Sequence, residues 1–177
     1  ELVGKNVFTN PKPVGLIKKC LVITTNEDDL VLDFFCGSGT TAHAVTQLNA
    51  EDGGSRKWIM VQLPEETDEG SEAFKAGYKT IPEISRERIR RAGDKIAKEH
   101  PDAKVDYGFR ALTIADTNYK DVYKPAHTTT QQELLSTVDN VKEDRTELDL
   151  LYGVLTASAL ELNRPLETRD IEGSNVF

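Results

Sequence analysis

The sequence predicts an α/β fold: a parallel βαβ unit of an open sheet, followed by a mostly helical C-terminal part. The run LVLDFF at residues 30–35 is apolar without alternation, which is typical of a parallel strand covered on both faces. A helical pattern, TTAHAVTQLN, follows at residues 40–49, and a second apolar run, KWIMVQL, ends at residue 63. From the first strand to the end of the second is about 34 residues, the size of a βαβ unit.

The composition limits the classes of protein to which this chain can belong. The chain has 177 residues, of which 38% are hydrophobic and 29% charged, as in a globular protein of one ordinary domain with an appendage. No apolar run approaches the roughly 18 residues that a membrane span needs, so we expect no membrane partner. Cys20 and Cys36 are too few for a disulfide framework or a metal cluster and favour a reducing cytoplasm.

The net charge of −8 argues against this chain alone forming a surface for the nucleic-acid backbone, which requires clustered Lys and Arg. A subunit of a DNA-acting machine could carry this charge if its DNA contacts lie elsewhere. The sequence begins at Glu1 and finishes on IEGSNVF, which resembles the start of a strand. We therefore expect a piece of a longer protein.

The elements follow in order. A first helix is predicted after NPKP, because Pro13 is favourable near a helix start. Its apolar positions fall near helical spacing: Leu16, Ile17, Leu21 and Val22 or Ile23. The helix after the first strand has one apolar stripe, made by Ala42, Val45 and Leu48, and the loop EDGG separates it from the second strand.

The later elements are more polar. A helix over residues 84–100, with Ile89, Ala92 and Ile96 facing inward, should stop at Pro101, and GFRALTI at residues 108–114 is predicted to be a strand. Further on, Thr130 and Glu133 have the spacing of a capping box. The following helix, ending before Pro165, has an apolar face of Leu148, Leu151, Leu155 and Leu162. These patterns divide the chain into residues 1–115 and a helical accessory or assembly region, residues 116–177.

The turn GSGTT at residues 37–41, called the glycine turn below, is the candidate ligand site. The loop after the first strand of a βαβ unit lies at the carboxyl edge of the sheet, where open α/β folds bind ligands. Gly37 and Gly39 let the backbone approach a ligand closely, and the N–H groups of a helix starting near Thr40 attract an anion. Asp33 adds a fixed negative charge, so the site suits a group carrying both charges.

The glycine turn differs from two other common ligand loops and shares the spacing of a third. A phosphate-binding Walker loop needs Lys after its last glycine, where this chain has Thr40, and Ser38 lacks the flanking glycines of a nucleophile elbow. Gly37, Gly39 and Ala42 do spell GxGxxA, so an NAD-dependent oxidoreductase domain remains an alternative. A glycine turn that binds no ligand is a second alternative.

NPKPVGLIKKCL followed by VLDFFCGSGTTAHA resembles the beta class of DNA amino-methyltransferases. The matching residues are Lys12, Pro13, Leu16 and Ile17, then Asp33, Phe35, Gly37, Ser38, Gly39 and Thr40. More narrowly, the chain resembles the modification (Mod) subunit of type III restriction-modification systems. The segments that carry this resemblance are FTNPKP, LNAEDGGSRKWIMVQLPEE, ISRERIRRA, DYGFRALTIADTN and the C-terminal LDLLYGVL. The resemblance runs nearly end to end.

The resemblance implies the cofactor half of a Rossmann-like methyltransferase sheet that binds S-adenosylmethionine. The parent protein would methylate N6 of adenine in DNA, contacting DNA through a missing N-terminal part. Its implied partners are a second modification subunit, in a homodimer, and a restriction helicase/nuclease subunit.

The resemblance also implies the binding residues. Asp33 and the glycine turn (Gly37, Ser38, Gly39, Thr40 and Thr41) would hold the methionine part of the cofactor. Phe35 would pack near it, and Lys12 and Pro13 would line the opposite wall, with Phe8 and Asn10 as further candidates. Relatives outside the type III group usually take both ribose hydroxyls with an acid at the end of the second strand. Here Gln62 stands at that place and Glu65 lies just beyond, and we favour Gln62.

The catalytic motif of the class, an Asp or Asn, two prolines and an aromatic residue, is absent from this sequence. We therefore expect no catalytic residue and no metal ligand here, and no methyl transfer by this chain alone. The basic stripe Arg88, Arg91, Lys95 and Lys98 could contact DNA, but the interleaved acids Glu87, Asp94 and Glu99 favour a solvated helix face. A non-enzymatic assembly module is the remaining alternative function.

Overall fold

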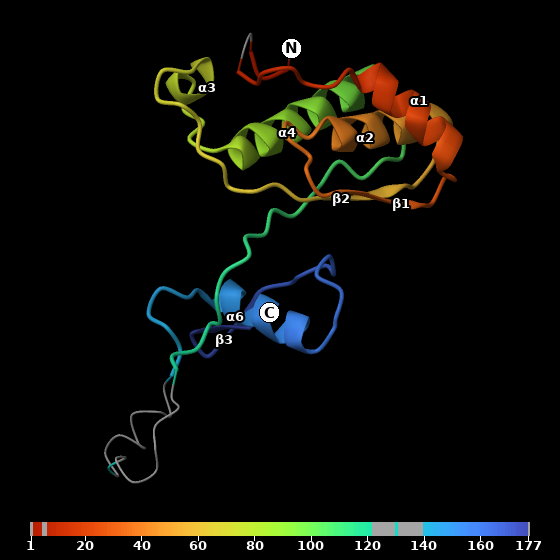
Figure 1. The fold of residues 1–177 in the computed structure, drawn as a ribbon. Coiled ribbons are helices and arrows are strands. Elements are labelled where there is room, and N and C mark those ends of the chain that lie inside the picture. Colours follow the sequence, from red (N-terminus) through yellow and green to blue (C-terminus); the bar gives the residue numbers. More distant parts are fainter. Residues whose placement is uncertain (1, 5–6, 122–129, 131–139, 177) are drawn as a thin grey trace. The chain divides into compact units, whose positions relative to one another are not determined.

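The computed structural model describes residues 2–4, 7–121, 130 and 140–176 (Figure 1). The chain divides into two compact units, Glu1–Phe109 and Arg110–Phe177, called unit 1 and unit 2 below. The cofactor-binding role of residues 1–115 and the accessory or assembly role of residues 116–177 remain predictions. Within the described residues, no helix has the length and apolar character that crossing a bilayer would require.

Unit 1 contains the predicted βαβ arrangement. Its elements are α1 (Val14–Thr24), β1 (Leu30–Asp33), α2 (Thr40–Asp52), β2 (Lys57–Met60), α3 (Glu72–Lys75) and α4 (Ile81–Glu99). The strands β1 and β2 are parallel, with Leu30 opposite Lys57 and Asp33 opposite Met60. Figure 1 shows α1, α2 and α4 on the same side of this small sheet.

The core of unit 1 lies around α2, which packs between α1 and α4. Ala42, Ala44 and Val45 are fully buried, since this helix is enclosed on more than one side. One buried cluster joins Leu21, Ala44, Val45 and Leu48, and Val14, Ile17, Val31 and Trp58 pack against it. Val31 and Trp58 are opposite each other in the sheet register, so they form the covered face of the sheet.

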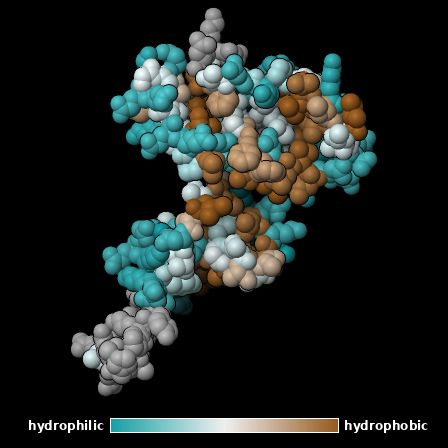
Figure 2. All heavy atoms as spheres, in the orientation of Figure 1, coloured by the Kyte–Doolittle hydropathy of each residue, from teal (hydrophilic) through white to brown (hydrophobic). Residues whose placement is uncertain are grey.

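Within unit 1, the other face of the sheet is not covered by the described residues, which corrects the prediction of a strand buried on both faces. The exposed side chains are Leu30, Leu32 and Phe34 from β1 and its end, and Ile59, Val61 and Leu63 from β2 and its end, each 41–61% accessible. Side chains alternate along a strand, so these residues share one face. Figure 2 shows apolar atoms gathered where the sheet lies in Figure 1.

Helix α1 begins after Pro13, as predicted, but its buried stripe differs from the predicted one. Val14, Ile17 and Leu21 pack into the core, a spacing of three and four residues that keeps them on one face. Leu16 and either Val22 or Ile23 were predicted as part of this stripe, yet all three are exposed.

Helix α4 starts three residues before the predicted position. A capping box formed by Thr80 and Glu83 sets this start, and a proline stands in the first turn. The predicted inward residues Ile89, Ala92 and Ile96 are buried. The helix ends at Glu99 before Pro101, as predicted, because proline cannot continue it.

Residues 108–114 do not form the predicted strand. The ring of Phe109 lies 5.9 Å from that of Trp58 and 5.6 Å from the Arg90 guanidinium, so the start of this segment packs through side chains. Leu112 and Ile114 are exposed. A strand needs a neighbouring backbone to pair with, and the described residues supply none for this segment.

Unit 2 contains α6 (Glu147–Ala157) and an antiparallel hairpin of β3 (Arg169–Ile171) and β4 (Ser174–Val176). The hairpin contains the strand predicted from the C-terminal IEGSNVF. A capping box of Thr146 and Asp149 begins α6, and Leu162 lies beyond its end rather than on its face. The predicted capping box falls outside the described residues, because Glu133 is not among them.

Candidate functional site

The glycine turn joins the end of β1 to the start of α2. Gly37 and Gly39 have φ angles of 53° and 74°, in the left-handed region that residues with a Cβ rarely adopt. Gly39 is the residue preceding the first turn of α2, and no side chain caps that end of the helix. The unsatisfied N–H groups of the first helical turn are therefore available to an anion.

Asp33 lies beside this helix start. Its carboxylate accepts hydrogen bonds from the Thr41 hydroxyl (2.6 Å) and from the Phe35 N–H (3.2 Å). The residue is half-buried, so its carboxylate is held in place while part of it stays accessible. Phe35, predicted to pack near a ligand, is 72% exposed and belongs to no buried cluster of the described residues.

Gln62 connects the end of β2 to the glycine turn. Its Oε1 accepts a hydrogen bond of 2.8 Å from the Gly37 N–H, which fixes the orientation of the amide, since an N–H needs an oxygen acceptor. The side-chain NH₂ remains to donate to a ligand. Glu65 is exposed, and its backbone carbonyl accepts from the N–H of Ile81, so the segment after β2 lies against the start of α4.

Helix α4 closes the back of the glycine turn. The Ser85 hydroxyl donates to the Gly37 carbonyl. The Arg88 Nη1 donates to Ser38 Oγ and to Thr40 Oγ1, both at 2.5 Å. Ser38, Thr40 and Arg88 are all buried, and burial lowers the pKa of the Arg88 guanidinium. The hydroxyls of Ser38 and Thr40 therefore face the protein interior.

The position of Arg88 corrects the prediction of a solvated basic stripe. Arg91, Lys95 and Lys98 are exposed, as predicted. Arg88 lies four residues after Ile84 and four before Ala92, both of which are buried, so it belongs to the inward stripe of α4. This spacing was visible in the sequence and could have identified the residue.

The segment before α1 also approaches the glycine turn. A Cβ at Gly37 would lie 3.1 Å from Cζ of Phe8, so the ring of Phe8 packs directly over this glycine. Lys12 and Pro13 are exposed at the start of α1, and within the described residues no hydrogen bond or ion pair joins Lys12 to the turn. Asn10 is exposed, with a φ of 54°.

Two buried groups near the turn have shifted pKa values. Burial raises the pKa of the Cys36 thiol, and the charge of Asp33 adds to the effect. Burial lowers the pKa of His43 to about 4, with further contributions from Arg88 and Lys95 of α4. His43 Nδ1 has no hydrogen-bond partner within the described residues. His43 is therefore a neutral core residue at pH 7.

This pKa predicts a pH dependence of stability. The folded value of about 4 lies below the ordinary 6.5, so unfolding takes up a proton between these pH values. The free energy of unfolding should fall by about 2–3 kcal/mol as pH drops through this window. Urea unfolding of the unaltered chain and of the His43→Gln variant, each at pH 7 and pH 5, measures this change in the free energy of unfolding. An equal loss of stability in both proteins would contradict the assignment.

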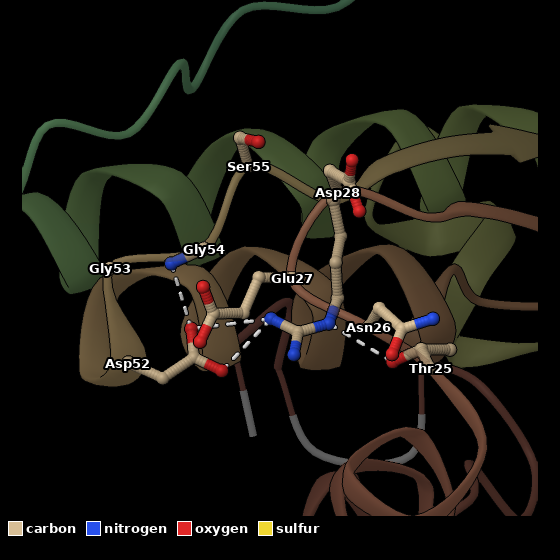
Figure 3. A pocket seen from close by; sticks show the side chains of 9 residues that line it. Thr25, Asn26, Glu27, Asp28, Asp52, Gly53, Gly54 and Ser55 are labelled. Carbon is tan, nitrogen blue, oxygen red and sulfur yellow. Dashed lines mark hydrogen bonds and ion pairs between the residues drawn. The ribbon is translucent and has the colours of Figure 1, made fainter.

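A pocket lies at the opposite, amino edge of the sheet (Figure 3). It is lined by residues that precede the two strands: Thr25, Asn26, Glu27, Asp28, Asp52, Gly53, Gly54, Ser55 and Arg56. The buried guanidinium of Arg56 donates to Thr25, Asn49 and Asp52, so its role is to hold these loops together. No group of three or more acidic, His or Cys residues in the described ranges could hold a metal ion.

Comparison with known proteins gives the following similarities. Residues 2–73 match the family model described as DNA methylase, for N6 and N4 methyltransferases. The chain is 50% identical over 115 residues to the type III restriction-modification enzyme StyLTI Mod subunit of Salmonella typhimurium, covering 65% of this chain and 18% of that protein.

Two further relatives agree. The EcoPI Mod subunit of Escherichia phage P1 is 40% identical over 116 residues, 66% of this chain and 18% of the relative. The type II methyltransferase M.KpnI of Klebsiella pneumoniae is 38% identical over 94 residues, 53% of this chain and 22% of the relative. The chain thus spans about a fifth of the length of these relatives.

Proposed function

Because this chain belongs to the family of type III restriction-modification Mod subunits, which are DNA methyltransferases, we propose that unit 1 binds S-adenosylmethionine. In the whole protein this cofactor would donate a methyl group to N6 of adenine in DNA. The observation that carries the proposal is the arrangement of Asp33 beside the uncapped start of α2.

The chemistry of the turn fits the methionine part of this cofactor. Its ammonium would meet the Asp33 carboxylate, and its carboxylate would meet the N–H groups at the start of α2. Glycine at positions 37 and 39 allows the positive φ angles of the turn and the close packing of Phe8 and Ile89 against it, which hold these N–H groups in place. Residues 38, 40 and 41 would act as part of this turn, while Phe35, Lys12 and Pro13 are proposed as the walls around the bound molecule.

The ribose contact is proposed for Gln62. Its NH₂ can donate to a hydroxyl, and its oxygen, already accepting from Gly37, keeps one further lone pair. This arrangement lacks the charge assistance of a carboxylate. Glu65 is the alternative residue for this contact, since it is exposed just beyond the end of β2.

When bound, the cofactor supplies an electrophilic methyl group on a sulfonium. The residues of this chain hold and orient it, and positioning is the main contribution a protein makes to such a transfer. The sequence has no Asp/Asn-Pro-Pro-aromatic tetrapeptide, so none of its residues is proposed to bind the target base.

The remaining parts of the active site are proposed to come from further polypeptide in the parent protein. The exposed apolar face of the sheet supports this, because a face of this kind usually meets another layer of structure. The parent is proposed to act in the cytoplasm on DNA, with a second modification subunit and a restriction helicase/nuclease subunit. This chain alone is proposed not to transfer methyl groups to DNA.

Calorimetric titration of this chain with S-adenosylhomocysteine and with NAD tests the cofactor. We expect the first ligand to bind and NAD to give no heat of binding. The alternative function, an NAD-dependent oxidoreductase domain, is suggested by the GxGxxA spacing of Gly37, Gly39 and Ala42. Binding of NAD without binding of S-adenosylhomocysteine would establish that alternative.

A further inference from the structure

Arg88 is a buried cation with an unusual set of partners. Its Nη1 donates to two hydroxyls, Ser38 Oγ and Thr40 Oγ1, and no ion pair joins it to a carboxylate within the described residues. A buried charge is costly unless it is paired, and neutral hydroxyls only partly offset that cost. The packing of α4 against α2 therefore encloses positive charge directly beneath the glycine turn.

The contacts of Arg88 also decide which groups of the turn face outward. With both hydroxyls directed at the guanidinium, Ser38 and Thr40 turn their side chains to the interior. Ser85, one turn earlier on α4, donates to the Gly37 carbonyl. These bonds from α4 hold the side chains and one carbonyl of the turn from behind, which leaves the ligand side to backbone N–H groups.

We propose that Arg88 is a positioning residue of this site, which fixes the glycine turn and favours an anionic ligand group through its charge. The proposal rests on the function proposed above and identifies a residue that raises the affinity of the site for the ligand carboxylate. Arg88 touches no ligand itself, because Ser38 and Thr40 lie between it and the outer side of the turn.

The test compares two ligands that differ in the amino-acid part: S-adenosylhomocysteine, which has the carboxylate, and 5′-methylthioadenosine, which lacks it. Arg88→Met should weaken binding of the first by about tenfold or more and of the second by less than about twofold. Arg88→Lys keeps the charge and should recover part of the loss. Arg91→Met is the matched control, since Arg91 is exposed on the same helix, and it should bind both ligands like the unaltered chain.

Amide hydrogen exchange without ligand tests independently whether Arg88 holds the glycine turn in place. In Arg88→Met the amides of residues 37–41 should exchange about tenfold faster or more, while protection in the middle of α2 shows that the variant is folded. Equal weakening of both ligands, or unchanged binding and exchange, would overturn the role of Arg88. Absence of binding by the unaltered chain would instead overturn the proposed cofactor, and with it this inference.

Discussion

Replacing Asp33 with Asn is expected to weaken S-adenosylhomocysteine binding by about 30-fold, about 2 kcal/mol. The asparagine oxygen can take the place of Oδ1 and accept from the Phe35 N–H, while its NH₂ takes the place of Oδ2 and donates to the Thr41 hydroxyl, which can also accept, so the turn should keep its shape. The loss arises because a neutral amide replaces the charge that would pair with the ligand ammonium. Calorimetric titration of both proteins measures the effect.

Asp29→Asn provides the matched control. Asp29 caps the Asn26 backbone N–H at the amino end of β1, whereas Asp33 stands at the carboxyl end of the same strand. Its substitution removes the same charge from the chain and should leave ligand binding unchanged. Equal affinities of the two variants would show that Asp33 does not bind the ligand.

Replacing Gly39 with Ala is expected to lower the free energy of unfolding of unit 1 by about 2–3 kcal/mol. Two effects add: the φ of 74° is unfavourable for alanine, and the new Cβ would lie 3.2 Å from the Ile89 side chain. Urea unfolding followed by the fluorescence of Trp58, the one tryptophan of the chain, measures unit 1, because this residue packs against its core.

Gly53→Ala separates the two effects. Gly53 ends α2 with a φ of 77°, nearly that of Gly39, but a Cβ there would meet nothing within 4 Å. We expect a loss of only about 1 kcal/mol, the backbone effect alone. Adding Ile89→Ala should cost less in the Gly39→Ala background than in the unaltered chain. Equal costs in both backgrounds would mean that Ile89 does not crowd this position.

The order of elements in unit 1 was predicted because local patterns specify it. Two apolar runs, the glycine turn and the helical stripe of Ala42, Val45 and Leu48 were enough to predict β1, α2 and β2, and the structure confirms them. Prolines similarly located the start of α1 and the end of α4. The strand predicted over residues 108–114 was wrong, since a strand requires a pairing partner that apolar residues alone do not provide.

The sequence by itself determined the parallel βαβ order, the turn that carries the candidate site and the acid beside it, because these depend on neighbours along the chain. Only the tertiary structure decided that Gln62 holds Gly37, that Arg88 lies beneath Ser38 and Thr40, and that unit 1 leaves one face of its sheet uncovered. Arg88 and Ser38 are 50 residues apart. The packing of α4 against α2 brings them together. Neither segment of the sequence, taken alone, shows that this contact forms.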